Sequence, residues 1–262
     1  MNTGISVLFF TAIVFLSGCS VAHQEQPLAA IAVVPGTPTS TEHNLVAASN
    51  PATVTTTDPN KPTKMPPKTF LALGDSYTIG QGVSEEDRWP VQLVSKLKAA
   101  GMLVADPVII AKTGWTTTDL ENALRAARPK PTFDIVTLLI GVNDQFQGQG
   151  IDEYTENFSA LLDQSIVLAK NDPKHVIVVS IPDWGTTPFA AGYDRAAIRR
   201  EIDQFNAINK SITEKKGAHY ADVTSISRNN ADETTPDGLH PSKDQYATWV
   251  AALLPTATSI AR

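Results

Sequence analysis

From Thr69 onward, apolar and polar positions follow two alternating patterns. Short apolar runs predict buried strands, and longer stretches with apolar residues three or four positions apart predict amphipathic helices. The first run, Phe70-Leu71-Ala72-Leu73, ends at Gly74. Four further strands are predicted at residues 107–111, 135–140, 175–181 and 219–223.

Helical patterns fill the intervals between these runs. They cover residues 91–100, the stretch after Thr118 up to Pro129, and residues 151–170, 195–216 and 242–254. Thr118 with Glu121, and Ser242 with Gln245, have the spacing of capping boxes, which predicts a helix start at each. Strands that alternate with helices predict a parallel sheet covered by helices on both faces.

The first 18 residues have the pattern of an export signal. Residues 5–16 are apolar apart from Ser6 and Thr11, and this run is shorter than the roughly 20 residues that span a bilayer. It ends in Leu16-Ser17-Gly18-Cys19, which resembles a bacterial lipobox. We therefore expect residues 1–18 to be a signal peptide and Cys19 to be the lipid attachment site. A plain secretory signal with an incidental cysteine is the alternative.

Residues 19–68 are rich in Pro, Thr, Ala and Ser and show no helical or strand period. Such a composition predicts a disordered tether between the lipidated cysteine and a catalytic domain at residues 69–262. In Gram-negative lipoproteins, Ser20 after the cysteine, in place of Asp, implies the outer membrane. The expected location is therefore the cell envelope, with the domain facing the periplasm.

Composition excludes several classes of partner and cofactor. The chain has 27 acidic and 21 basic residues and a net charge of -6, which argues against a nucleic-acid-binding surface. Its single cysteine, Cys19, rules out an intrachain disulfide and a multi-cysteine zinc site. The five histidines lack a metal-ligand spacing, so no metal is expected.

The residues that can carry chemistry follow the predicted strands. Ser76 follows the first strand, Gly114 the second and Asn143 the third, while Asp237 and His240 precede the last helix. Ligands of doubly wound sheets bind at the carboxyl ends of the strands, so we expect these residues to share one rim.

Together these residues supply what acyl transfer from an ester needs. A serine hydroxyl requires an adjacent base, and His240 can take the proton of Ser76 while Asp237 fixes the tautomer of the imidazole. The backbone N–H groups of Ser76 and Gly114 and the side-chain amide of Asn143 can donate to the oxyanion.

In their order along the chain, these blocks resemble those of the SGNH hydrolases, also called GDSL esterases and lipases. The matching positions are Gly74-Asp75-Ser76, Gly114, Gly141-x-Asn143-Asp144 and Asp237-x-x-His240. The resemblance spans about residues 69–255 and departs at Tyr77, where many members have Leu. It implies a three-layer α/β/α sandwich, flavodoxin-like, with about five parallel strands and no cofactor. Asp75 and Asp144 are expected to support the loops.

Aromatic residues near the predicted rim have two possible roles, because they can form a substrate pocket or cap the end of the sheet as core. They are Trp115, Phe146, Trp184, Phe189 and Tyr193. Trp89 precedes the first predicted helix and Trp249 lies in the last, and both are expected to be core residues.

The sequence therefore predicts a monomeric serine esterase that hydrolyses carboxylic esters through an acyl-enzyme. Its expected partners are a small-molecule or envelope ester and, through Cys19, the membrane, but no nucleic acid. Three alternatives stay open: an O-deacetylase of cell-envelope polysaccharide, an acyltransferase with the same site, and a non-catalytic envelope-binding lipoprotein.

Overall fold

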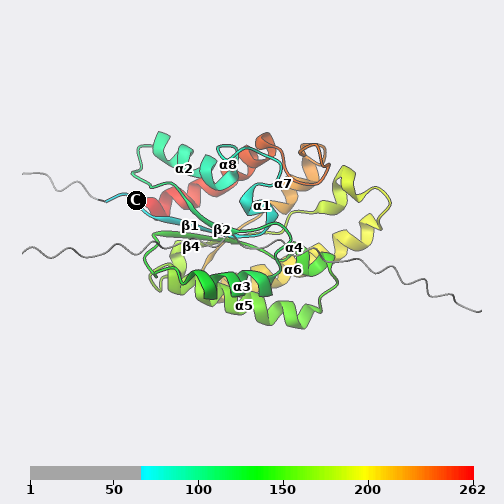
Figure 1. Cartoon of the computed structure of the whole chain (residues 1–262), viewed down its shortest axis with the longest axis horizontal. Coiled ribbons are helices and arrows are strands. Elements are labelled where there is room, and N and C mark those ends of the chain that lie inside the picture. The colour runs from blue at the N-terminus through cyan, green and yellow to red at the C-terminus, as the bar shows by residue number, and fades with distance from the viewer. Residues whose placement is uncertain (1–65) are drawn as a thin grey trace, which may run out of the picture. The chain divides into compact units, whose positions relative to one another are not determined.

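The computed structural model describes residues 66–262, drawn in colour in Figure 1. The predicted signal peptide, Cys19 and the tether up to residue 65 lie outside the described residues. Lys68 already forms an isolated parallel bridge with Val104, and its backbone N–H donates to Leu103. The folded part therefore includes Lys68, next to the predicted domain start at Thr69.

Five parallel strands form the central sheet. They are β1 (Phe70–Gly74), β2 (Val108–Ala111), β3 (Ile135–Leu139), β4 (Val176–Val179) and β5 (His219–Ala221). Their order across the sheet is β2-β1-β3-β4-β5, and β1 pairs in register with both β2 and β3. This arrangement confirms the predicted fold class.

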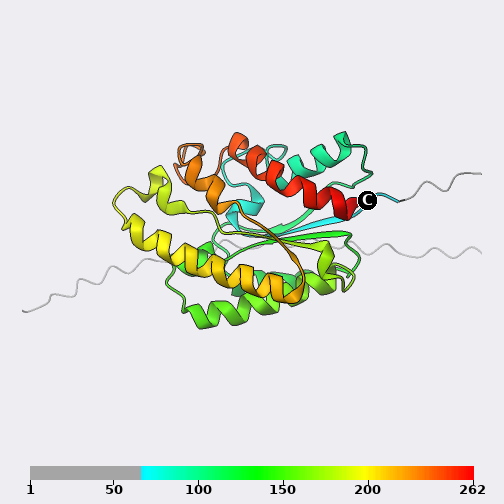
Figure 2. The same ribbon diagram turned by 180° about the vertical axis from the view of Figure 1, so that it is seen from behind.

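Helices cover both faces of the sheet (Figures 1 and 2). One face carries α2 (Trp89–Ala99) and α8 (Lys243–Ala261). The other carries α3 (Thr117–Ala127), α5 (Ile151–Leu168) and α6 (Arg195–Lys216). Because both faces are covered, every residue of β1, β3 and β4 is buried, as their apolar runs predicted. Trp89 and Trp249 are core residues, which confirms that prediction.

Short helices at the loop ends complete the architecture. They are α1 (Ser76–Ile79), α4 (Val142–Phe146) and α7 (Thr224–Asn229), together with single 3₁₀ turns η1 (Pro173–His175), η2 (Trp184–Thr186) and η3 (Pro188–Ala190). The hydrophobic pattern did not predict them because they are too short to show a period. None of the helices in residues 66–262 has both the length and the apolar character that a membrane span requires.

The predicted start of α3 at Thr118 lies two residues too late. Thr116, not Thr118, caps the helix: its hydroxyl accepts from the Asp119 N–H, and Asp119 accepts in return from the Thr116 N–H. Burial explains the choice, since Thr116 and Thr117 are buried whereas Thr118 is exposed. The pair with Glu121 is therefore not a capping box.

The predicted start of α8 at Ser242 is confirmed, but the capping box and the predicted end at Leu254 need correction. Ser242 caps the helix through the Gln245 N–H, but the Gln245 side chain donates instead to the carbonyls of Asn230 and Glu233. The helix also continues through Pro255 to Ala261. The exposed proline costs one backbone hydrogen bond, and the buried faces beyond it keep the last turns packed on the core.

Candidate active site

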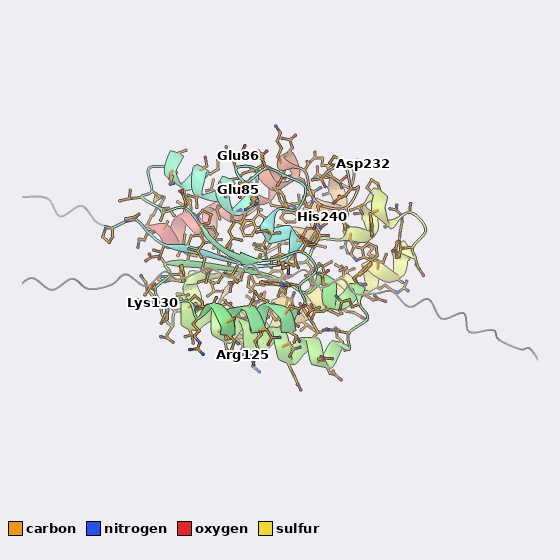
Figure 3. All side chains as sticks on the ribbon, viewed as in Figure 1. Glu85, Glu86, Arg125, Lys130, Asp232 and His240 are labelled. Carbon is orange, nitrogen blue, oxygen red and sulfur yellow. The ribbon has the colours of Figure 1, made fainter. Side chains whose placement is uncertain are left out.

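The carboxyl ends of β1, β2 and β3 bring the predicted residues to one rim, where the strand order reverses on either side of β1. A pocket of about 250 Å³ opens there. It is lined by Ser76, Tyr77, Gln81, Thr113, Gly114, Val142, Asn143, Phe146, Trp184, Phe189, Leu239 and His240. Figure 3 shows His240 close to the sheet end at which α1 begins. The structure thus gathers Ser76, Gly114, Asn143 and His240 around one cavity.

Ser76 is the first residue of α1, a single helical turn that follows β1 directly. Asp75 caps this turn by accepting from the Tyr77 N–H at 2.9 Å. Gly74 has no room for a side chain, because a Cβ there would lie 2.4 Å from the Leu139 carbonyl oxygen. The tight passage from strand to helix therefore depends on glycine and places the serine at the rim.

The carboxyl group of Asp75 is completely buried. Burial raises its pKa to about 8, the nearby Asp144 adds to this rise, and the hydrogen bond from the Tyr77 N–H only partly opposes it. Its second oxygen has no hydrogen-bond partner among residues 66–262. A pKa of about 8 keeps Asp75 mostly protonated at pH 7, and its hydrogen bond from Tyr77 supports the turn, as expected for this position.

His240 and Asp237 form a direct pair. His240 Nδ1 lies 2.6 Å from Asp237 Oδ2, and the His240 side chain is buried while that of Asp237 reaches solvent. An Nδ1–H that donates to the carboxylate leaves Nε2 without a proton, so that this atom can act as a base toward the pocket.

Several donors converge on Asp237. Its Oδ1 accepts from the backbone N–H groups of Leu239 and His240 and from the Thr235 hydroxyl. Partial burial by itself would raise the pKa of Asp237, but the His240 ring and these donors outweigh it and lower the pKa to about 2. The partner of His240 is therefore fully ionised at neutral pH.

Three groups can donate to a carbonyl oxygen in the pocket. Asn143 Nδ2 uses one hydrogen on the Trp115 carbonyl at 2.9 Å, which leaves its second hydrogen free. The backbone N–H groups of Ser76 and Gly114 have no acceptor within the described chain. Gly114 has a φ of 82°, in the left-handed region that favours glycine.

No hydrogen bond joins the Ser76 hydroxyl to His240 among the described residues. Catalytic hydrogen bonds are commonly long in free enzymes and shorten only when substrate binds. Both side chains line the same pocket. The catalytic roles of Ser76, Asp237 and His240, and of the oxyanion donors, stay predictions.

Asp144, the other expected support, is buried and joins two helices. It accepts from both the backbone N–H and the hydroxyl of Thr117, at the start of α3. Burial raises the pKa of Asp144, and the bonds from Thr117 partly oppose this rise. This contact holds α4, and with it Asn143, against the first turn of α3.

Three of the five aromatic residues have the pocket role foreseen for them, Trp115 packs partly buried against the core, and Tyr193 is exposed outside the pocket. Phe146, Trp184 and Phe189 line the pocket, whereas Trp115 and Tyr193 do not. Trp184 is buried and packs edge-on against Phe146 at a centroid distance of 5.4 Å and against Tyr193 at 5.2 Å. It is thus both core and pocket wall.

Polar contacts that sequence reasoning missed hold this wall. Trp184 Nε1 donates to Gln145 Oε1 at 2.8 Å, and Arg195 donates to three successive carbonyls of the loop, those of Gly185, Thr186 and Thr187. Arg228 pairs with the buried carboxylate of Asp183 just before Trp184. No motif marks these residues, because they meet only through the fold.

Two further pocket residues were missed, Gln81 and Thr113. Each lies next to a recognised block, Gln81 after the nucleophile turn and Thr113 directly before Gly114, and this adjacency was the available signal. In the described part of the chain, no cluster of three His, Cys, Asp or Glu side chains could hold a metal ion.

A model of the GDSL-like lipase/acylhydrolase family matches residues 72–248. The chain belongs to this family. The match covers Ser76, Gly114, Asn143 and the Asp237–His240 pair, and membership makes the protein a carboxylic ester hydrolase. No curated protein matches the sequence.

Solved structures of GDSL-type esterases share the fold. TesA has a TM-score of 0.58 and 18% identity, over 74% of this chain and 99% of TesA. An acetylxylan esterase from Geobacillus stearothermophilus has a TM-score of 0.58 and 20% identity, over 73% of this chain and 94% of its own. The esterase EstA from Pseudoalteromonas sp. has a TM-score of 0.53 and 22% identity, over 73% and 97%. At these identities the likeness establishes the fold of this GDSL-like hydrolase.

Proposed function

We propose that this protein is a serine esterase that hydrolyses carboxylic esters through an acyl-enzyme intermediate. One observation carries the proposal: an ionised Asp237 holds His240 at 2.6 Å, and His240 lines the same pocket as Ser76. A serine hydroxyl beside an oriented imidazole is the arrangement that nucleophilic catalysis on esters requires.

In the first half-reaction, Ser76 Oγ attacks the ester carbonyl carbon while His240 Nε2 takes the hydroxyl proton. Negative charge collects on the carbonyl oxygen, where the N–H groups of Ser76 and Gly114 and the Asn143 amide donate to it. The imidazolium then gives its proton to the departing alcohol, which leaves an acyl group on Ser76. Water, deprotonated by His240, releases the acid by the same steps.

The size of the pocket supports a short acyl group. Its volume of about 250 Å³ lies below the roughly 300–1,000 Å³ of pockets that enclose drug-sized ligands. Removal of acetyl groups from envelope polysaccharide, the alternative that the sequence left open, fits this size equally well. p-Nitrophenyl esters of increasing chain length, assayed beside acetylated glycans, distinguish a general short-chain esterase from a deacetylase.

Labelling of Ser76 tests the proposal. A serine-directed phosphonate should modify the wild-type protein at Ser76, and the Ser76→Ala variant should lose ester hydrolysis while keeping its fold, measured by circular dichroism. Ser225 is exposed and is not among the residues that line the pocket, so Ser225→Ala is the matched control and should keep full activity. Modification at another serine, or activity retained in Ser76→Ala, would contradict the assignment.

We further propose that Cys19 anchors the enzyme to a membrane of the cell envelope through a lipid. The lipobox-like segment and the Pro/Thr-rich stretch after it support this location. Cys19→Ser should move the protein from the membrane fraction to the soluble fraction, or leave an unprocessed precursor, without loss of specific activity. A Cys19→Ser protein that still pellets with membranes after signal cleavage would show that the anchor is wrong.

A further inference from the structure

The two ends of the pocket differ in chemistry. Beyond β3 and β4 its wall is apolar and consists of Val142, Phe146, Trp184 and Phe189, to which the loop before α8 adds Leu239. The only donor on that wall, Trp184 Nε1–H, is already used on Gln145. This end can therefore make apolar contacts with a substrate, but its side chains offer the substrate no hydrogen bond.

The opposite end, beyond β1 and β2, carries two polar side chains. The Thr113 hydroxyl donates to Gln81 Oε1 at 2.6 Å. This bond orients the Gln81 amide, and its partly exposed Nε2 group makes no hydrogen bond to other residues in 66–262. An amide NH₂ carries two donor hydrogens, so Gln81 presents two unused donors at the pocket.

The backbone holds this pair at a fixed place relative to the chemistry. The Gln81 N–H donates to the Ser76 carbonyl at 3.0 Å, at the end of the nucleophile turn. Thr113 directly precedes Gly114, whose N–H belongs to the proposed oxyanion site. A substrate atom that accepts from Gln81 therefore lies in the same pocket as Ser76 and Gly114.

We propose that Gln81, oriented by Thr113, forms a hydrogen-bonding subsite for an oxygen atom that the substrate carries on the side of the ester facing β2. The preferred substrates are then esters with a hydroxyl or carbonyl oxygen at that end and an apolar group at the aromatic end. This inference rests on the proposed esterase function and names its substrate class. Gln81 acts in binding and selectivity and takes no part in proton transfer.

Two pairs of esters of nearly equal shape test the subsite. 2-Hydroxyethyl butanoate and propyl butanoate differ by a hydroxyl in place of a methyl on the alcohol, and methyl 3-hydroxypropanoate and methyl butanoate differ likewise on the acid. The readout is the ratio of kcat/KM within each pair, obtained by titration of the released acid. A substitution that only disturbs the structure changes kcat/KM for both esters of a pair by the same factor, and therefore leaves this ratio unchanged.

Gln81→Met removes the donors but keeps the length of the side chain. The ratio of hydroxylated to plain ester should fall about 3- to 10-fold in at least one pair, which corresponds to the loss of one hydrogen bond. The pair that responds identifies which end of the ester lies over β2. Thr113→Val should lower the same ratio by a smaller factor, because the amide is then no longer held in place, whereas Thr113→Ser should restore it.

Gln204→Met on the exposed surface of α6 is the matched control, and its ratios should equal those of the wild type. If both ratios in Gln81→Met stay within twofold of the wild type, the subsite is wrong and the esterase assignment stands. If wild-type protein hydrolyses none of the four esters nor the p-nitrophenyl esters, the proposed function itself fails and the subsite with it.

Discussion

Two segments of the site each place an aspartate beside a side chain with a proposed catalytic role, in opposite environments. Asp75 precedes Ser76, is completely buried and accepts a single hydrogen bond, and its pKa rises to about 8. Asp237 stands beside His240, has 37% of its side chain exposed and is bound by four groups, and its pKa falls to about 2. The number of donors and the access of water decide which carboxyl group is charged.

This difference suits the proposed chemistry. Negative charge develops on the substrate oxygen next to the N–H of Ser76, and a second negative charge on Asp75 would repel it at short range. A neutral Asp75 shapes the nucleophile turn without that cost. The ionised Asp237, by contrast, stabilises the positive charge that His240 gains in the same step.

The two aspartates should differ most in how much their substitution lowers kcat. Asp237→Asn should lower kcat by about 10⁴, because an amide cannot hold the productive tautomer of His240. Asp75→Asn replaces a neutral carboxyl with a neutral amide of the same shape, so its kcat should fall by far less. Steady-state kinetics on p-nitrophenyl butanoate measure both variants, and equal losses would show that Asp75 acts as an ion.

A third loop sharpens the comparison, because it carries a reacting amide beside another buried carboxyl group. Asn143→Ala should lower kcat by about 10²–10³ with little change in KM, since its donor acts mainly on charge that develops in the transition state. The same kinetic assay separates the two constants. A change confined to KM would make Asn143 a substrate-binding residue instead.

The sequence predicted that these residues share one rim because they follow strand ends. Ser76, Gly114 and Asn143 each come a few residues after an apolar run, and parallel strands bring their carboxyl ends to the same edge of the sheet, where one pocket contains all three. The Asp237–His240 pair is local in sequence, so its geometry was within reach of spacing alone. The five strands were found for the same reason, since buried parallel strands form continuous apolar runs.

What the sequence did not predict depends on tertiary packing. Thr116 and Thr118 are both acceptable helix caps, and only the burial of Thr116 selects it. The neutral state of Asp75 follows from the complete burial of its carboxyl group, which no local pattern encodes. Trp184 could be core or pocket until its neighbours were known, and it proved to be both.

The buried carboxyl group should also affect stability at moderate pH. Between the unfolded pKa near 3.9 and about 8, folded Asp75 keeps a proton that the unfolded chain has lost. The free energy of unfolding should therefore fall as pH rises across this window, by about 1.4 kcal/mol per pH unit at most, and level off above it. Asp75→Asn should lack this decline. Urea unfolding of both proteins at pH 5, 6.5 and 8 gives the difference in their free energies of unfolding at each pH. A constant difference across the three values would mean that Asp75 is charged in the folded protein.

The smallest expected effect concerns Asp237, whose side chain is partly exposed. Its contribution to the free energy of unfolding should rise with pH, whereas that of Asp75 falls. Its folded pKa of about 2 lies below the unfolded value near 3.9, so its stabilising contribution is complete above about pH 4 and is lost as pH falls toward 2. The advantage of wild type over Asp237→Asn in unfolding free energy should therefore shrink as the pH is lowered from 5 to 2. Asp232, labelled in Figure 3, is an exposed residue of the same loop. Asp232→Asn is therefore the control, because it removes a carboxylate that does not accept the hydrogen bonds found at Asp237. If both variants differ from wild type by the same amount at every pH, the hydrogen bonds around Asp237 do not favour its charged form in solution, and the contrast with Asp75 is lost.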